Sequence, residues 1–305
     1  MTEPLRIVSL IPSATEIVAS LGLVEYLVGR SHECDYPIPV QSLPACTQPQ
    51  FNPSGSSGEI HQRVTNVLES ALSVYRVETD LLRQLQPTHI LTQDQCEVCA
   101  CSLADVEAAV KEAIDSQPQI ISLQPNTLAE VWGDIARVAQ QLGVDACDVL
   151  NSLQSRVNQV TAQAQSLEFH PTVACIEWVE PLMIAGNWIP ELVQLAGGQP
   201  ILATSGQHSP WVDWQALVEA DPDIVVLMPC GFDLTRTRQD LAQLAERSQW
   251  QQLKAVQHRQ VYVTDGNAFF NRPGPRLVDS LCILAEMFHP ELFAFGYRGM
   301  AWEVA

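Results

Sequence analysis

Short apolar runs alternate along the chain with stretches in which apolar residues recur at helical spacing. The short runs are bounded by proline, glycine or polar residues, which is typical of strands buried in a parallel sheet. The predicted strands cover residues 6–10, 26–30, 89–92, 119–123, 173–178, 224–228 and 260–264. The predicted helices cover residues 14–21, 60–72, 78–85, 103–114, 128–142, 190–196, 214–220, 241–253 and 275–288. This alternation predicts an α/β fold with mostly parallel sheets flanked by helices.

The same order of elements occurs twice, which predicts two lobes. Between the two sets lies a helical stretch, residues 145–167, with no internal proline or glycine. At 1.5 Å per residue this helix would run about 30 Å, roughly the width of a small domain. We therefore expect an N-terminal α/β lobe over residues 1–143, a linker helix over 144–168 and a C-terminal α/β lobe over 169–305.

The first predicted helix carries a capping signal. Ser13 and Glu16 have the spacing of a capping box, in which each side chain accepts a hydrogen bond from a free amide of the other residue. The helix would then start at the carboxyl end of the first strand, where open α/β proteins place their ligand sites.

Composition and charge exclude some partners. The chain has 305 residues, with 35 acidic against 16 basic side chains and a formal net charge of -19. Such a charge repels phosphate backbones and anionic membrane surfaces, so nucleic acid is not an expected partner. The N-terminal apolar run is interrupted by Pro12 and Glu16, and no later segment approaches the length of a membrane span. The nine cysteines are an odd number without disulfide-framework spacing. We expect a cytoplasmic location and no membrane insertion.

Cysteines follow the predicted strands in both halves. Cys96, Cys99 and Cys101 come after the strand at residues 89–92, and Cys230 comes after the strand at 224–228. Two thiolates at C-x-x-C spacing can bind one metal ion, and Cys34 with His32 in the neighbouring loop could complete a tetrahedral site. The predicted metal ligands are Cys34, Cys96, Cys99 and Cys101, for zinc or another soft metal. The alternative is that these cysteines are small buried side chains.

Three segments of the chain match a known family. They are the run from Arg6 to Val18, the run from Val28 to Pro37 and the Arg-Pro-Gly-Pro-Arg sequence that ends at Arg276. With the repeated proline-strand units, they make the chain resemble the class III periplasmic binding proteins. These are the ligand-capturing subunits of ABC importers for cobalamin and ferric siderophores, and the cobalamin branch is nearest.

The resemblance implies two α/β lobes joined by a rigid helix, with a ligand in the cleft between them. The cleft loops of the family fall on residues 32–36, 92–99, 177–188 and 267–272. In the cobalamin branch, aromatic side chains from these loops stack on or flank the corrin. Here the corresponding residues would be Tyr36, Trp178, Trp188 and either Phe269 or Phe270.

The sequence thus predicts a cytoplasmic binding protein that holds a small molecule, a corrinoid, cobalamin-like or other metallo-macrocyclic ligand, and performs no catalysis. The predicted ligand-binding residues are His32, Glu33, Cys34, Tyr36, Gln93, Cys96, Cys99, Glu177, Trp178, Trp188, Trp211, Cys230, Phe269, Phe270, Asn271 and Arg272.

Two alternatives stay open. The first is a metal- or thiol-dependent enzyme that uses Cys34, Cys96 and Cys99. The second is the substrate-binding subunit of a cobalamin or siderophore ABC importer. The family's transport role requires a secretion signal, which the N-terminus does not show, and Asn271 lies where a glutamate that docks on the importer is expected. Docking to an ABC permease is therefore in doubt.

Overall fold

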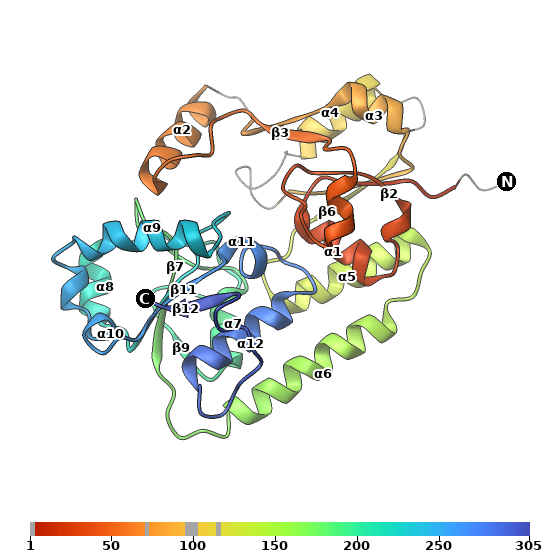
Figure 1. The fold of residues 1–305 in the computed structure, drawn as a ribbon. Coiled ribbons are helices and arrows are strands. Elements are labelled where there is room, and N and C mark those ends of the chain that lie inside the picture. Colours follow the sequence, from red (N-terminus) through yellow and green to blue (C-terminus); the bar gives the residue numbers. More distant parts are fainter. Residues whose placement is uncertain (1–3, 71–72, 95–102, 114–116) are drawn as a thin grey trace. The chain divides into compact units, whose positions relative to one another are not determined.

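The chain divides into two compact units in the computed structural model, which describes residues 4–70, 73–94, 103–113 and 117–305. Unit 1 consists of Met1–Gly55, Glu59–Pro125 and Trp132–Leu150. Unit 2 consists of Ser56–Gly58, Asn126–Val131 and Asn151–Ala305. The predicted linker is present as helix α6 (Cys147–Ala164), and the division between the units falls within it (Figure 1). The role of α6 as a rigid connector stays a prediction.

Unit 1 is built on a four-stranded parallel sheet. Its strand order is β2-β1-β5-β6, from β2 (Leu27–Arg30), β1 (Ile7–Ser9), β5 (His89–Gln93) and β6 (Gln119–Leu123). Helices of this unit, wholly or in part, are α1 (Pro12–Ser20), α2 (Ser57–Glu69), α3 (Thr79–Leu85), α4 (Leu103–Ala113) and α5 (Leu128–Leu142). A separate antiparallel pair joins β3 (Thr47–Pro49) to β4 (Tyr75–Val77).

Both faces of the unit 1 sheet are buried. Val8 and Ile90 on one face pack in a cluster with Leu82 of α3 and Val106 of α4. Side chains that alternate with them, such as Ile7, Leu91 and Ile121, are buried as well. Parallel sheets covered on both faces have continuous apolar strands, which is why the sequence pattern located these strands well.

Unit 2 holds a mixed sheet. Its strand order is β12-β11-β10-β7-β8, and β9 pairs with the first residues of β7, off this path. The strands are β7 (Thr172–Trp178), β8 (Met183–Ile184), β9 (Gln199–Pro200), β10 (Ile224–Leu227), β11 (Val261–Thr264) and β12 (Trp302–Val304). The helices are α7 (Ile189–Leu195), α8 (Trp214–Ala220), α9 (Leu234–Ala245), α10 (Lys254–Gln257), α11 (Gly266–Phe269) and α12 (Leu277–Phe288). The described residues also form three short 3-10 helices. Two lie in unit 1, Val24–Tyr26 and Ile38–Ser42, and one lies in unit 2, Trp250–Gln252.

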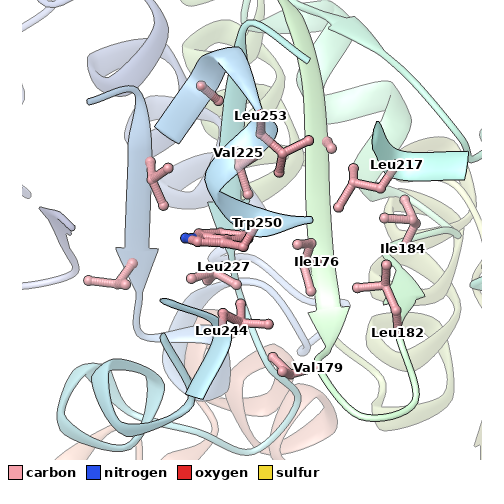
Figure 2. Close-up of a cluster of buried hydrophobic side chains, with 14 residues drawn as sticks. Ile176, Val179, Leu182, Ile184, Leu217, Val225, Leu227, Leu244, Trp250 and Leu253 are labelled. Carbon is pink, nitrogen blue, oxygen red and sulfur yellow. The ribbon is translucent and has the colours of Figure 1, made fainter. Parts of the chain in front are cut away.

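The two faces of the unit 2 sheet pack against different helices. Ile176 and Val225 point into a cluster with Leu217 of α8, Leu244 of α9 and Trp250 (Figure 2). On the opposite face, Cys175 lines a small pocket together with Ile189 and Val193 of α7. This alternation of side chains along β7 fixes the layer order of helix, sheet and helix in this unit.

Glu286 of α12 organises the C-terminal segment of unit 2. Its buried carboxylate accepts hydrogen bonds from the backbone N–H of Gly296 (2.5 Å) and Tyr297 (3.2 Å) and from the indole N–H of Trp302 (2.8 Å). Three donors satisfy a buried carboxylate whose desolvation would otherwise be costly. The segment then ends as β12, antiparallel to β11 at one edge of the sheet.

Several predicted helix boundaries differ from the structure, and two of the helices show why. Helix α1 starts at Pro12, with Ile11 as the N-cap residue and no side-chain cap, so the capping box of Ser13 and Glu16 does not form. Proline at the first helical position favours this earlier start, because its ring presets the helical φ angle. Likewise, the helix predicted over residues 241–253 ends at Ala245 and starts at Leu234, where the side chain of Asp233 accepts a hydrogen bond from the N–H of Arg236.

Within the described ranges, no helix combines the length and the apolar character needed to cross a membrane.

Candidate functional site

The carboxyl ends of β1 and β2 carry a connected set of hydroxyl groups. The N–H of Ser31, just after β2, donates to the carbonyl of Ser9 at the end of β1 (2.7 Å). The hydroxyl of Thr47 donates to Ser31 Oγ (3.0 Å). Parallel strands place their ends at one edge of the sheet, so these residues, distant in sequence, come together.

His32 is anchored to this set by Thr47. The backbone N–H of His32 donates to Thr47 Oγ1 (3.1 Å), and Nδ1 of the ring lies 2.8 Å from the same oxygen. Burial, and then the charge of Arg30, lower the pKa of His32, although the hydrogen bond with Thr47 acts in the opposite direction. The imidazole is therefore neutral at neutral pH.

Glu33 lies beside this ring. The hydroxyl of Tyr75 donates to Glu33 Oε1 (3.1 Å), and that oxygen is 4.0 Å from His32 Nε2. The rings of His32 and Tyr75 are 5.3 Å apart between centroids. Thr47 and Tyr75 belong to the antiparallel pair of β3 and β4, whose strands are too short for a sequence pattern to indicate.

Cys34 lies in the interior of unit 1. Its thiol is buried, with the hydroxyl of Thr15 at 3.0 Å from the sulfur. A buried thiol behaves as a small apolar side chain, so its position does not support the predicted contact with a metal or a ligand. Cys96, Cys99 and Cys101, the other predicted metal ligands, lie outside the described residues. Among the residues that are described, no three histidine, cysteine, aspartate or glutamate side chains gather as a metal site.

The remaining predicted residues of unit 1 differ in exposure. Tyr36 is 46% exposed, as expected for a side chain that contacts a ligand. Gln93, the last residue of β5, is buried. The tyrosine is thus accessible, and the glutamine is not.

Glu177 marks the carboxyl end of β7 in unit 2. It is half-buried and accepts a hydrogen bond from the hydroxyl of Ser209, which in turn accepts one from the N–H of Gly186 (2.9 Å). Burial raises the pKa of the Glu177 carboxyl, and the hydrogen bond from Ser209 and the charge of His208 partly oppose this rise.

We expect the Glu177→Gln variant to be more stable than the wild-type protein at pH 7. A carboxyl whose pKa is raised by folding favours the folded state only while it is protonated, and this contribution is lost as the pH rises through the folded pKa. The advantage of the variant should therefore shrink as the pH falls and vanish below the unfolded pKa of about 4.3. Urea unfolding at several pH values measures this difference. Equal stabilities at pH 7 would contradict the expectation.

Trp178 begins a stack of side chains at the ends of β7 and β10. Its ring lies 5.3 Å from that of Phe232. The guanidinium of Arg236, in the first turn of α9, lies 4.4 Å from the centroid of the Phe232 ring. The indole N–H of Trp178 donates to the carbonyl of Glu180 (3.1 Å), which fixes the orientation of its ring. The ring of Trp178 remains partly exposed. We call Trp178, Phe232 and Arg236 the aromatic stack.

Arg236 is held by a buried acid. Its Nη1 is 2.9 Å from Oδ1 of Asp240, one turn further along α9, and the Asp240 side chain is fully buried. Burial raises the pKa of Asp240, and the charge of Arg236 opposes this rise. Sequence analysis missed Phe232 and Arg236. Phe232 follows the end of β10, and this position could have identified it as a candidate. Arg236 could be placed next to Phe232 only once the start of α9 was known.

Trp188 and Phe270 lie in the interior of unit 2. They are 7% and 0% exposed, and the indole N–H of Trp188 donates to the backbone carbonyl of Phe270 (2.9 Å). Arg272, predicted to grip a ligand, is buried as well. Side chains that are this buried are poorly placed to touch a ligand, so we assign these three residues to packing.

The other predicted residues of unit 2 lie nearer the surface. Trp211 is 53% exposed, and Cys230 is half-buried with its N–H donating to the carbonyl of Glu177 (3.1 Å). Phe269 is half-buried beneath the guanidinium of Arg276, 5.4 Å from its ring centroid, and Asn271 is also half-buried. The structure thus brings together Glu177, Trp178 and Cys230 at one strand edge.

Solved structures of binding proteins share this fold. A periplasmic heme binding protein from Pseudomonas aeruginosa aligns with a TM-score of 0.71 at 19% identity, over 95% of this chain and 94% of that one. The periplasmic vitamin B12 binding protein BtuF of Vibrio cholerae aligns with a TM-score of 0.66 at 20% identity, over 93% of this chain and 96% of that one. These similarities confirm the predicted α/β class and its helix-flanked parallel sheets.

Sequence comparison points the same way. The chain is 23% identical to YvrC of Bacillus subtilis, described as an uncharacterized ABC transporter substrate-binding lipoprotein. The alignment spans 301 residues and covers 95% of this chain and 82% of YvrC. The sequence pattern of the family described as periplasmic binding protein matches residues 7–268. Because this match spans most of the chain, the protein belongs to the periplasmic binding protein family and is a binding protein rather than an enzyme.

Proposed function

We propose that this protein is the substrate-binding subunit of an ABC importer, and that its cargo is a metallo-macrocycle such as a heme or a corrinoid. The curated relative is a substrate-binding lipoprotein of an ABC transporter, and two proteins of the same fold are named for binding heme and vitamin B12. These findings favour the importer alternative over the cytoplasmic corrinoid-holding protein that the sequence suggested first. An ABC permease is then the expected partner.

The aromatic stack is the observation that supports a metallo-macrocycle as the cargo. Trp178 presents a partly exposed ring whose orientation is fixed by its bond to Glu180, and Phe232 supports it from within. A flat, rigid ring is suited to a flat ligand, because little side-chain freedom is lost on binding. In a chain of net charge -19, the guanidinium of Arg236 supplies a positive group next to these rings for the acidic or amide side groups that surround such macrocycles.

Unit 1 has groups of a different kind at the carboxyl ends of its own strands. The neutral imidazole of His32, the carboxylate of Glu33 and the exposed phenol of Tyr36 can each interact with a metal or with polar side groups. The substrate-binding subunit of an importer captures its cargo outside the cytoplasm, so this proposal conflicts with the cytoplasmic location expected from the sequence. Fractionation of cells that express the natural gene decides between the two locations.

Titration of the purified protein with hemin, cyanocobalamin and a ferric siderophore tests the proposal. We expect one of the two macrocycles to bind at one equivalent, with a shift of its visible absorption and a dissociation constant of about 1 μM or tighter, which corresponds to about -8 kcal/mol. The urea-unfolded protein is the control for nonspecific adsorption. Binding of the siderophore alone would contradict the cargo class, and binding of none of the three would contradict the proposed function.

A further inference from the structure

An extra residue in β7 turns the side chain of Trp178 out of the core of unit 2. Ile176 pairs with Ile184 of β8, whereas Trp178 pairs with Met183, so β7 advances by two residues where β8 advances by one. In a regular strand Trp178 would share a face with Ile176, which is buried in the cluster of Figure 2. A bulge with one extra residue, here Glu177, re-aims the side chain beside it, and Trp178 is accordingly half-buried rather than part of the cluster.

Met183 lies next to Trp178 on the neighbouring strand. Leu182 and Ile184, on either side of Met183, both belong to the buried cluster. Because successive side chains of a strand point to opposite faces, Met183 points away from this cluster, and it is partly exposed. Residues that are directly opposite each other in antiparallel strands have side chains on one face, so the thioether of Met183 lies beside the indole of Trp178.

Trp211 is the next side chain in the same direction. It is directly opposite Met183, in a short segment that runs antiparallel to β8. Two hydrogen bonds flank this pair, from the N–H of Ile184 to the carbonyl of Pro210 (3.1 Å) and from the N–H of Val212 to the carbonyl of Leu182 (3.0 Å). In pairs that are flanked rather than joined by their hydrogen bonds, the Cα atoms are only about 4.5 Å apart and the side chains are close. The indole of Trp211 is exposed.

Trp178, Met183 and Trp211 therefore form one line of side chains across three adjacent segments, which we call the exposed row. Neighbouring strands are about 4.8 Å apart, so the exposed row spans about 10 Å between its two outer backbones. A thioether between two indoles makes favourable contacts with both rings and adapts to the shape of a ligand. Trp178 also belongs to the aromatic stack, so the two sets of side chains are continuous.

We propose that Met183 and Trp211 extend the binding surface of Trp178, so that one flat face of the cargo covers the exposed row. This inference rests on the proposed function and names the residues that select the cargo by its width. A macrocycle is wide enough to contact all three side chains at once. A smaller flat ligand would contact one or two of them and lose the remaining contact area.

Titration of variants with hemin and with cyanocobalamin tests the exposed row. For the macrocycle that binds the wild-type protein, Trp211→Ala should weaken binding about tenfold. Met183→Gln keeps the length of the side chain but makes its end polar, and should weaken binding about fivefold. Trp211→Phe and Met183→Leu keep an apolar surface and should retain most of the affinity, which separates contact with the cargo from damage to β8.

Phe169→Ala is the matched control for these variants. Phe169 is 68% exposed and lies just before β7, at the end of the strand opposite to Trp178. Its removal deletes an exposed ring from unit 2 and should leave the affinity for the macrocycle unchanged.

Protection of Met183 from oxidation is a second measurement, which a merely structural role of this residue would not affect. The protein is treated with hydrogen peroxide in the dark, and methionine sulfoxide is measured by mass spectrometry. The added ligand is cyanocobalamin, or gallium protoporphyrin in place of hemin because its metal does not react with peroxide. Bound ligand should slow the oxidation of Met183 severalfold, because contact with the ligand covers the sulfur. Met300, which is 60% exposed, is the internal control and should be oxidised at an unchanged rate.

Failure of this inference can be distinguished from failure of the proposed function. Wild-type affinity in both Trp211→Ala and Met183→Gln, together with unchanged oxidation of Met183, would overturn the exposed row and leave the proposed function intact. Failure of the wild-type protein to bind either hemin or cyanocobalamin would overturn both.

Discussion

Replacing Trp250 with alanine is expected to lower the free energy of unfolding by about 3–5 kcal/mol. Trp250 is 2% exposed and lies among the side chains of β7, β10, α8 and α9 that form the cluster in Figure 2. It also meets the ring of Trp214 edge to face, with 6.4 Å between centroids. Removing the indole leaves a cavity that the neighbouring strands cannot close, because they are held in the sheet by their own hydrogen bonds.

Urea unfolding followed by circular dichroism measures the effect of Trp250→Ala. The control is Trp211→Ala, which removes the same ring from a position that is 53% exposed and should change the free energy of unfolding by no more than about 0.5 kcal/mol. Equal losses in the two variants would show that the cluster does not determine the stability of unit 2.

Replacing Trp178 with alanine is expected to weaken macrocycle binding about 10- to 100-fold, or about 1.4–2.7 kcal/mol. The variant loses the exposed ring of the aromatic stack and leaves Phe232, which is buried, as the remaining ring. Because Trp178 is partly exposed, its loss should cost much less folding free energy than the loss of Trp250.

Titration with the macrocycle that binds the wild-type protein measures the effect of Trp178→Ala. Trp178→Phe keeps a flat ring and should retain most of the affinity, which separates stacking from general disturbance of the strand end. Wild-type affinity in Trp178→Ala would remove the aromatic stack from the binding site, and the cargo class would then lose its main structural support.

The long buried elements could be predicted because their patterns are complete within the sequence. Strand β6 and helices α5 and α8 have the bounds that the pattern predicted. Strands β8 and β9 have two residues each, which is too short for any periodicity. The start of α9 was missed because its first turn is polar, and the cap by Asp233 precedes the apolar spacing that drew attention to the later residues.

Residues of the candidate site could be predicted where they lie at the end of a strand. They could not be predicted where contacts between distant segments of the chain determine their position. Glu177 and Trp178 could be found because they end an apolar strand. Trp178 and Trp188 looked alike in the sequence, yet a bond to the backbone of Phe270 holds Trp188 in the interior. Thr47 and Tyr75 contact His32 although they lie 15 and 43 positions away along the chain, and no local pattern indicates such pairing.

The three N–H donors around Glu286 also bear on how the protein can be handled in the laboratory. Two of them, from Tyr297 and Trp302, lie in the segment that leads into β12, and β12 occupies the sheet edge beside β11. Removing residues 302–304 would strip the buried carboxylate of its indole donor and uncover the edge of β11. A purification tag should therefore neither replace nor interrupt this segment.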